Sequence, residues 1–524
     1  MELFVFRLLA TLLWLQAFLA TALSQKHVSR STDLTRLPSL SKVRTFVLTD
    51  VLNEPDDSMS LVRYLVYSNE FDTRGLVATT SWSLRNKTHP EEIVKIVNAY
   101  AMVVEKLNNH VNPNSGYPAP KELLNKITSG PRVSNEYTSL RTLVLTSQSY
   151  GRLALDELLS DGARLLIQRL QESTQPLYVG VWGGANTLAQ ALQHLDKTRS
   201  KAEAAKLRSR LRVYSISDQD DCGPLIRVKW PDVLYIVNVH GFREYQLGTW
   251  LGINTGDNSA VDKTKVLDPW LTPNIRIGPL GEVYPKIIYG MEGDTPSFLW
   301  LIQNGLSVPE RPDYGGWGGR YTRVTEQTDI NEYGTSADTV VDVRGQNYSS
   351  HYATIWRWRD AYQDDFAARM HWTVTDSYKD AAHPPVVSIN GSSGTQPLRF
   401  KLSRNDSIVL DASETYDTDN LEDRSGLEFE WYSYPECAKR WLSFITERYF
   451  DVRPLSPPSG SDGILDVNGT GFRNVALGAR VQISTNLPEG NITPGAEWHV
   501  ILQVTNNKGV YPIRRYKRVI IEVS

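Results

Sequence analysis

Short apolar runs alternate with helical patterns over most of the chain. The run Val43–Leu48 is followed by helical spacing over Ser58–Tyr67, and the run Gly75–Thr80 by a helix predicted over Pro90–Leu107. The same alternation continues with strands predicted at Leu177–Trp182, Leu211–Ile216 and Val233–Val239, and helices at Asn186–Leu195, Phe298–Asn304 and Thr354–Met370. Strand–helix alternation of this kind favours an α/β domain with a mostly parallel, Rossmann-like sheet, which we place at residues 42–381.

The pattern changes at His383-Pro384-Pro385, after which no long helical spacing occurs. The remaining apolar runs are short and are separated by Gly, Pro, Asn and Asp, which is typical of an all-β sandwich over residues 384–524. The Pro/Ser/Gly-rich segment Pro454–Gly463 is predicted to be an exposed loop. Strands are expected at Val386–Ile389, Ile408–Leu410, Leu427–Tyr434, His499–Thr505 and Arg515–Val523.

The first residues have the order of a secretory signal peptide. Arg7 precedes the apolar run Leu8–Leu23, and Ala20-Thr21-Ala22 supplies small residues for cleavage. We therefore expect residues 1–24 to be removed and the mature protein to be secreted and free of the membrane, with an uncleaved anchor as the alternative. Glycosylation sequons fit this route and begin at Asn86, Asn347, Asn390, Asn405, Asn468 and Asn491.

Composition narrows the partners. Lys and Arg number 56 against 59 Asp and Glu, a formal net charge of −3, so no nucleic acid or anionic membrane is expected to bind. Cys222 and Cys437 are the only cysteines, which excludes a disulfide framework and a cysteine-based zinc site. Whether these two form a single bridge cannot be decided from their spacing.

The first predicted strand runs directly into an acidic loop. Asp50 closes the strand, and Asn53, Glu54, Asp56 and Asp57 follow within a few positions. Ligands of α/β sheets bind beyond the carboxyl ends of the strands, and crowded carboxylates repel one another unless a cation neutralises them. A hard divalent cation, most naturally Ca²⁺, fits this set of oxygen ligands. Capping of the next helix is the alternative, and it explains Asp56 and Asp57 but not Asp50.

Two further acidic clusters stand at predicted element ends. Asp220 and Asp221 follow the strand Leu211–Ile216, and Glu292 and Asp294 precede the helix that starts at Phe298. A solvated turn and a helix cap are the respective alternatives. Trp82 ends the second strand, where an aromatic ring could meet a sugar.

Glycines mark two other places of interest. Gly183-Gly184 follow Trp182 and would allow close approach of the backbone to a ligand. The glycine-rich loop Gly315–Tyr321 could close over a sugar or wrap the edge of the domain.

These motifs resemble those of inosine–uridine nucleoside hydrolases, in which an Asp at a strand end and a following Asp-Asp pair hold Ca²⁺. The resemblance is closer to the nucleoside-hydrolase-like family named after a bacterial cellulose-binding protein, and it covers nearly the whole mature chain. That family carries the same C-terminal immunoglobulin-like sandwich. The matching segments are Thr49–Asp57, Ile216–Asp221, Tyr289–Ser297 and Gly315–Tyr321.

The resemblance implies a site around one Ca²⁺. Asp50 would be a metal ligand and the catalytic general base, and Asp57, Asp294 and the backbone carbonyl of Trp182 would complete the metal ligands. Asp56 would accept a sugar hydroxyl. Further substrate-binding residues are expected among Asn53, Glu54, Trp82, Asp220, Asp221 and Glu292. The loop has two more residues between Asp50 and Asp56 than the nucleoside hydrolase signature, so a different pocket mouth is expected.

Three functions remain open at this point. The first is a Ca²⁺-dependent glycoside hydrolase acting on an extracellular saccharide, and the second is a polysaccharide-binding protein without catalysis. The third is hydrolysis of extracellular nucleosides, although no histidine matches the position of an acid for the leaving base.

Overall fold

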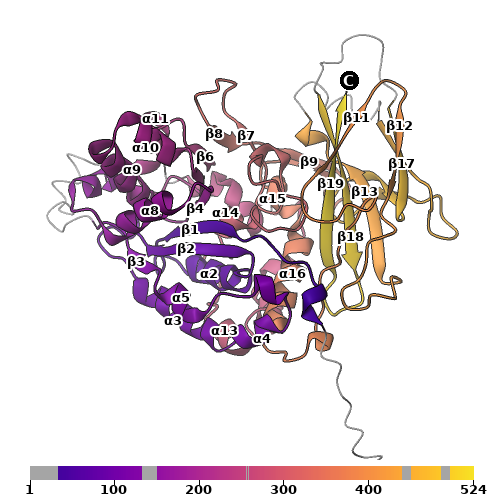
Figure 1. The fold of residues 1–524 in the computed structure, drawn as a ribbon, viewed down its shortest axis with the longest axis horizontal. Coiled ribbons are helices and arrows are strands. Elements are labelled where there is room, and N and C mark those ends of the chain that lie inside the picture. Colours follow the sequence, from indigo (N-terminus) through magenta and orange to yellow (C-terminus); the bar gives the residue numbers. More distant parts are fainter. Residues whose placement is uncertain are drawn as a thin grey trace, which may run out of the picture.

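The structure, a computed structural model, describes residues 33–132, 150–438, 450–485 and 496–523 with the exception of residues 243, 255 and 258. The predicted signal peptide and the sequon at Asn491 lie outside these residues. An α/β domain and a β-sandwich stand side by side, as Figure 1 shows. Within the described ranges, no helix has the length and apolar character needed to span a bilayer.

The α/β domain is built on one eight-stranded sheet with the order β3-β2-β1-β4-β5-β6-β8-β7. All neighbours from β3 to β8 are parallel, and β7 alone is antiparallel to its neighbour. This arrangement confirms the predicted mostly parallel α/β fold. The strands are β1 (Val43–Thr49), β2 (Phe71–Ala78), β3 (Ile127–Ser129), β4 (Leu177–Val181), β5 (Leu211–Ser215), β6 (Leu234–Val237), β7 (Tyr321–Arg323) and β8 (Glu332–Thr335).

Helices cover both faces of this sheet because both faces of each strand are apolar. On β1, Val47 belongs to one hydrophobic core, whereas Phe46 and Leu48 belong to the other. The first core is covered by α2 (Asp56–Val66), α3 (Pro90–Ala101), α14 (Pro296–Leu299) and α16 (Arg359–Trp372). The second is covered by α8 (Asp161–Glu172), α9 (Asn186–Thr198), α10 (Lys201–Arg208) and α11 (Cys222–Lys229).

Two segments predicted as single helices are each broken. Pro90–Leu107 forms α3 and then α4 (Val104–Asn108), and Thr354–Met370 forms α15 (Ala353–Trp356) and then α16. The second break allows both Arg357 and Trp358 to be buried where the two domains meet. The other short helices are α5 (Pro120–Leu124), α7 (Tyr150–Leu153), α12 (Asp268–Asn274) and α13 (Gly278–Glu282).

The C-terminal domain has a six-stranded sheet, β11-β19-β18-β13-β16-β15, and a three-stranded sheet, β12-β17-β14. Both sheets contribute to one hydrophobic core, which confirms the predicted all-β sandwich. The strands are β11 (Leu398–Leu402), β12 (Ser407–Asp411), β13 (Leu427–Ser433), β14 (Phe450–Pro454), β15 (Ile464–Val467), β16 (Arg473–Leu477), β17 (Arg480–Thr485), β18 (Glu497–Asn506) and β19 (Ile513–Val523). A small hairpin, β9 (Asp338–Val341) with β10 (Asn347–Ser350), lies outside both domains' sheets.

One predicted strand of the sandwich is wrong. Val386–Ile389 forms only isolated bridges, in which Val386 pairs with Tyr416 and Ile389 with Ser392. The two prolines before it, Pro384 and Pro385, remove backbone donors that a ladder would need. Pro454–Gly463 connects β14 to β15 and is largely exposed, as predicted.

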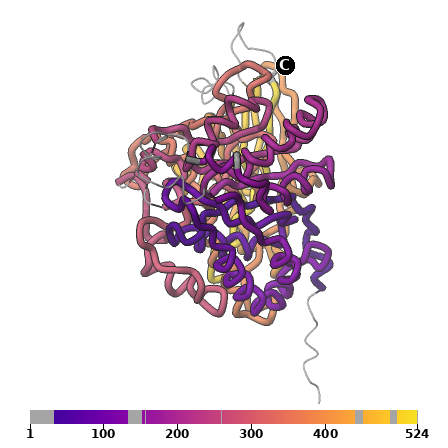
Figure 2. The backbone as a smooth tube through the Cα atoms, turned by 90° about the vertical axis from the view of Figure 1, so that its left-hand side faces the viewer, coloured from indigo at the N-terminus to yellow at the C-terminus, as the bar shows by residue number. Residues whose placement is uncertain are grey.

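The two domains share a hydrophobic core. Trp317 and Trp358 of the α/β domain are fully buried with Tyr434, Phe472 and Tyr516 of the sandwich. In the view of Figure 2, the strands of the sandwich lie directly behind the α/β domain. A continuous buried interface of this kind holds the domains in one orientation.

Arg518 on β19 fixes the glycine-rich loop to this interface. Its buried guanidinium donates to the carbonyl oxygens of Leu306, Tyr314 and Gly315 at 2.8 to 3.2 Å. The loop Gly315–Tyr321 therefore wraps the edge of the domain, which was the second of the two roles that its sequence allowed.

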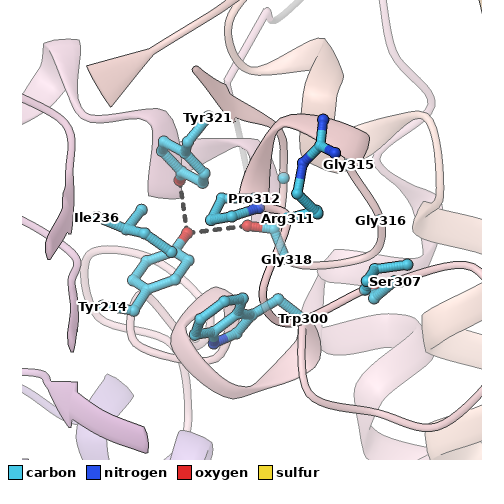
Figure 3. A pocket seen from close by; sticks show the side chains of 12 residues that line it. Tyr214, Ile236, Trp300, Ser307, Arg311, Pro312, Gly315, Gly316, Gly318 and Tyr321 are labelled. Atoms are coloured by element: carbon cyan, nitrogen blue, oxygen red, sulfur yellow. Dashed lines mark hydrogen bonds between the residues drawn. The ribbon is translucent and has the colours of Figure 1, made fainter. Parts of the chain in front are cut away.

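The same loop lines a small pocket in the face of the sheet (Figure 3). Tyr214 lies at its floor, and its hydroxyl donates to the carbonyl of Gly318 at 2.9 Å and contacts the hydroxyl of Tyr321 at 2.5 Å. None of the acidic residues predicted to bind a metal is among the residues that line this pocket.

A buried histidine pair connects the domains at the start of the linker. Nδ1 of His110 lies 2.9 Å from Nε2 of His383, and Nδ1 of His383 lies 2.6 Å from Oδ1 of Asp419. Burial, together with the neighbouring His383, lowers the pKa of His110 to about 4, and burial also lowers the pKa of His383. The folded protein therefore favours neutral imidazoles at this junction.

We expect this pair to make the fold acid-sensitive. The pKa of His110 is lower in the folded than in the unfolded protein, so protonation of this imidazole favours unfolding. The contribution of neutral His110 to the free energy of unfolding is complete above pH 6.5 and is lost as the pH falls towards 4. The loss from His110 amounts to about 3 kcal/mol of unfolding free energy. Denaturant unfolding of wild type and His110→Gln between pH 7 and pH 4.5 measures the difference, with His194→Gln as the control. A variant with the pH dependence of the wild type would contradict this account.

Candidate functional site

The acidic loop lies at the topological switch point of the sheet. Strand β1 is flanked by β2 on one side and by β4 on the other, so the chain leaves β1 and β4 on opposite sides of a crevice. Asp50 follows β1 and is 1% exposed, and Gly183 follows β4. The Cβ position of a side chain on Gly183 would lie 2.7 Å from Oδ1 of Asp50. The ends of the two strands therefore meet at Asp50.

Three other carboxylates gather beside it. Asp56 and Asp57 form the first turn of α2, and Asp294 comes from the loop before α14. One carboxylate oxygen of each lies within 4.8 Å of the others, a spacing that suits a shared metal ion. Thr49 donates its hydroxyl to Oδ1 of Asp57 and so orients this side chain. The N-cap residue of α2 is Pro55, which makes no side-chain capping bond, so neither Asp56 nor Asp57 is the N-cap of this helix.

The electrostatics of this group are those of crowded, buried acids. Burial, together with the nearby Glu54, raises the pKa of Asp50 to about 6 and that of Asp56 to about 7. Burial and the other carboxylates of the group raise the pKa values of Asp57 and Asp294 well above the usual range. All the charged groups that shift the pKa values of these four aspartates are themselves carboxylates. The site therefore favours a cation.

Two atoms test whether a metal fits. Oδ2 of Asp50 and Oδ2 of Asp294 are buried and have no hydrogen-bond partner within the described structure. Buried polar atoms without partners are costly, and they are rare unless a water or an ion satisfies them. Four carboxylates, two of them with a buried oxygen that has no partner, form the oxygen-rich donor set that Ca²⁺ prefers. The residues present thus fit the predicted cation.

Asn53 and Glu54 lie at the mouth of the site. The loop turns sharply here, because the backbone N–H of Asn53 donates to the carbonyl of Asp50 at 2.9 Å and Leu52 adopts a φ of 71°. Asn53 is half-buried and Glu54 is exposed. Hydrogen bonding by Asn53 lowers the pKa of Asp50, so its side chain contacts the predicted catalytic carboxylate.

Trp182 is held in place by both of its polar groups. Its indole N–H donates to Oγ of Ser297 at 2.6 Å, and its backbone carbonyl accepts a hydrogen bond from the side-chain amide of Gln219. A carbonyl oxygen has two lone pairs, so this bond leaves one for the predicted metal contact. Gln219 was not expected at the site, because nothing in its own sequence context distinguishes it from a turn residue.

The structure gives Asp220 a capping role. Oδ2 accepts from the N–H of Asn186 at 3.0 Å and Oδ1 from the N–H of Cys222 at 2.9 Å, so one carboxylate caps the first residues of α9 and α11. Asp221 accepts from the N–H of Arg152 at 2.9 Å. These hydrogen bonds account for the positions of both carboxylates, so the predicted contact with a substrate is not needed to explain them.

Glu292 departs further from its predicted role. Its side chain is fully buried, and its Oε2 forms an ion pair with Arg63 at 2.5 Å. Tyr284 and Thr295 donate their hydroxyls to it at 2.6 and 2.9 Å. Because all of its partners are buried protein groups, the structure assigns Glu292 to holding the loop that carries Asp294, not to binding a substrate.

Trp82 lies half-buried at the edge of the sheet, next to the site. Its backbone N–H donates to the carbonyl of Gln219 at 2.8 Å. The guanidinium of Arg85 lies 3.7 Å from the centre of its ring, and Phe242 packs edge-on at 5.3 Å. The structure thus brings an aromatic pair to the place where only Trp82 was expected.

The remaining sequence predictions concern the surface and the cysteines. Asn86, Asn347, Asn390 and Asn405 are exposed. Asn468 is buried, and its side-chain oxygen accepts from Thr470 and from the N–H of Phe472, so a glycan there would require this turn to open. The structure therefore disagrees with glycosylation of Asn468.

Cys222 and Cys437 are both free and buried. Cys222 begins α11, and Cys437 lies at the domain interface, where its thiol donates to the carbonyl of Tyr314 at 2.9 Å. The single bridge that the sequence left open is not formed.

Comparisons with known proteins agree with this architecture. No curated protein matches the sequence significantly. Among solved structures, a nucleoside hydrolase-related hypothetical protein from Saccharophagus degradans, described as associated with carbohydrate metabolism, matches with a TM-score of 0.68. The two sequences are 26% identical, and the match covers 92% of this chain and 100% of the other.

Two family models match the sequence. Residues 407–523 match the C-terminal domain of the cellulose-binding protein Sde0182. Residues 44–321, which contain all the predicted metal ligands, match the nucleoside hydrolase-like domain of cellulose-binding Sde182. The chain therefore belongs to the nucleoside-hydrolase-like family of the cellulose-binding protein Sde182.

Proposed function

We propose that this protein is a secreted, Ca²⁺-dependent glycoside hydrolase that acts on an extracellular saccharide. The observation that carries the proposal is the convergence of Asp56, Asp57 and Asp294 within 4.8 Å, beside the buried and unpartnered Oδ2 of Asp50. Crowded carboxylates lower the stability of a fold, and such groups are typical of functional sites. These four lie at the carboxyl ends of the strands, where ligands of α/β sheets bind.

The chemistry follows from the positions of the acids. Asp57, Asp294 and the carbonyl of Trp182 would hold Ca²⁺, which when bound supplies Lewis-acid activation of the attacking water. Asp50 is also a predicted ligand, and its carboxylate would accept the proton of that water. Asp56 would accept a hydroxyl of the sugar. The remaining negative charge of the site would stabilise the oxocarbenium-like transition state of glycoside cleavage.

The saccharide substrate and the extracellular location have separate support. The family description names cellulose binding, and the related solved protein is described as associated with carbohydrate metabolism. The signal-like first residues and four exposed sequons support secretion. A non-catalytic polysaccharide-binding protein is the second candidate, and the family's cellulose-binding description favours it.

An activity screen with and without chelator tests the proposal. We expect the full mature chain to release product from at least one glycan or nucleoside of a broad panel in the presence of Ca²⁺. EGTA should reduce the rate at least about 100-fold, because the site would lose the group that activates water. Readdition of Ca²⁺ should restore it. Binding of a polysaccharide without turnover under any condition would reject the hydrolase and favour the second candidate.

A further inference from the structure

Trp250 lies directly beside the acidic site. The Cβ position of a side chain on Gly293 would lie 2.6 Å from Oδ2 of Asp56 and 3.0 Å from Cζ3 of Trp250. The carboxylate that would receive a sugar hydroxyl and the indole ring therefore flank the same glycine. Half-buried Trp250 packs against the large core and remains partly exposed to solvent.

Hydrogen bonds fix the orientation of this ring. The indole N–H of Trp250 donates to Oγ of Ser217 at 3.2 Å, and the same oxygen lies 2.8 Å from Nε2 of His240. Ser217 follows β5, and His240 follows β6. Two neighbouring strand ends thus hold Trp250 against the acidic group, as a rigid wall of a binding site requires.

Phe242 comes near the site through Trp82, which follows Ser81, a hydrogen-bond partner of Asp50. It follows His240 by two residues, is 52% exposed, and packs edge-on against Trp82. Trp82 is joined by its backbone to Gln219, whose side chain holds the carbonyl of Trp182. Phe242 is therefore connected by three successive contacts to a predicted metal ligand, Trp182.

The loops that carry the acids also expose apolar side chains. Leu52, two residues after Asp50, is 49% exposed, and Tyr289, five residues before Asp294, is 77% exposed. Exposed apolar groups beside polar site residues are typical of binding surfaces. Leu52 and Tyr289 thus add apolar surface to the two loops that carry Asp50 and Asp294.

We propose that Trp250 and Phe242 are specificity-determining residues that stack on sugar rings of a neutral polysaccharide. The inference rests on the proposed function, since it concerns the same site. The C–H faces of a pyranose ring are apolar and match flat aromatic rings. The charged groups that act on Asp50, Asp56, Asp57 and Asp294 are all carboxylates, so the anionic groups of uronic acid or sulfated chains would meet acids and no basic partner there.

Calorimetric titration of the mature chain with two hexasaccharide probes tests this inference. One probe is a β-1,4-linked glucose hexamer, and the other is a galacturonate hexamer. We expect the neutral probe alone to bind in the presence of Ca²⁺. Phe242→Ala and Trp250→Phe are each expected to weaken its affinity about tenfold, the effect of losing or shrinking one aromatic contact. Val510→Ala, an exposed apolar position on the sandwich, is the matched control.

The outcomes separate this inference from the proposed function. Equal affinity for both probes, no affinity for the neutral one, or unchanged affinity in both aromatic variants overturns it. Turnover that requires Asp57 but neither aromatic ring would leave the hydrolase proposal intact and remove the stacking surface. Neutral-probe binding that requires the two rings, with no turnover of any substrate, would support the stacking surface and reject the hydrolase. Unfolding curves that match wild type show that each variant is folded.

Discussion

Replacing Asp57 by Asn is expected to stabilise the Ca²⁺-free protein and to abolish the response to Ca²⁺. The wild-type carboxylate is 4% exposed and lies close to Asp56 and Asp294. Burial raises its pKa, and the carboxylates of Asp50 and Asp56 contribute to the same rise. Removing one buried like charge relieves this repulsion by about 1 kcal/mol or more. The amide oxygen of Asn can still accept the hydroxyl of Thr49, so the hydrogen bond that orients the side chain is preserved.

Thermal unfolding in EGTA and in Ca²⁺ measures both effects. In wild type, Ca²⁺ at 100 times its dissociation constant adds about 2.7 kcal/mol of stability, whereas Asp57→Asn should gain almost none and should lose turnover at least about 100-fold. Asp329→Asn, at an exposed acid, is the control and should keep the wild-type shift. A variant that is less stable than wild type in EGTA, or that still responds to Ca²⁺, would mean that Asp57 is a structural residue.

The proximity of these carboxylates could be predicted in part from the sequence, because the ends of parallel strands converge. Asp50 directly follows an apolar run, and parallel strands bring their carboxyl ends to one edge. Asp57 follows within one turn of a helix, so its distance from Asp50 is fixed locally. Asp294 is distant in the sequence, and its assignment depended on the family resemblance. The structure brings all three together.

Partners from distant segments set the limits of that prediction. Glu292 stands beside Asp294 in an equally acidic loop, but Arg63 on α2 and Tyr284 hold its carboxylate in the core. No feature of the sequence near Glu292 predicts its ion pair with Arg63. The position of Trp250 against Asp56 depends likewise on how two loops fold over the sheet, which local patterns do not specify.

Helix breaks were missed for a related reason. The spacing of Thr354–Met370 is helical throughout, but the helix stops so that Arg357 can form an ion pair with the buried Asp338 at 2.9 Å. Asp338 in turn binds Arg320 and the hydroxyl of Tyr434 from the sandwich. Burying a charge without such partners is costly, so tertiary pairing overrides local helix preference.

Gly183→Ala is expected to reduce turnover at least about 100-fold while the protein remains folded. The added Cβ would lie 2.7 Å from both Cβ and Oδ1 of Asp50, closer than real side chains approach, so Asp50 must move. A displacement of about 1 Å in a catalytic group costs on the order of 100-fold in rate. Overpacking itself costs about 1 to 3 kcal/mol, and Gly183 has no positive φ that would add backbone strain.

Comparison with a second glycine separates geometry from stability. Gly469→Ala adds the same methyl group where no atom lies within 4 Å, so its rate and stability should equal those of wild type. Steady-state rates and unfolding curves for both variants give the two quantities. If Gly183→Ala kept the wild-type rate, Asp50 could not be the group whose position limits the reaction. If its rate fell and Ca²⁺ still stabilised it, Asp50 would act mainly on the water and the metal would depend chiefly on Asp57 and Asp294.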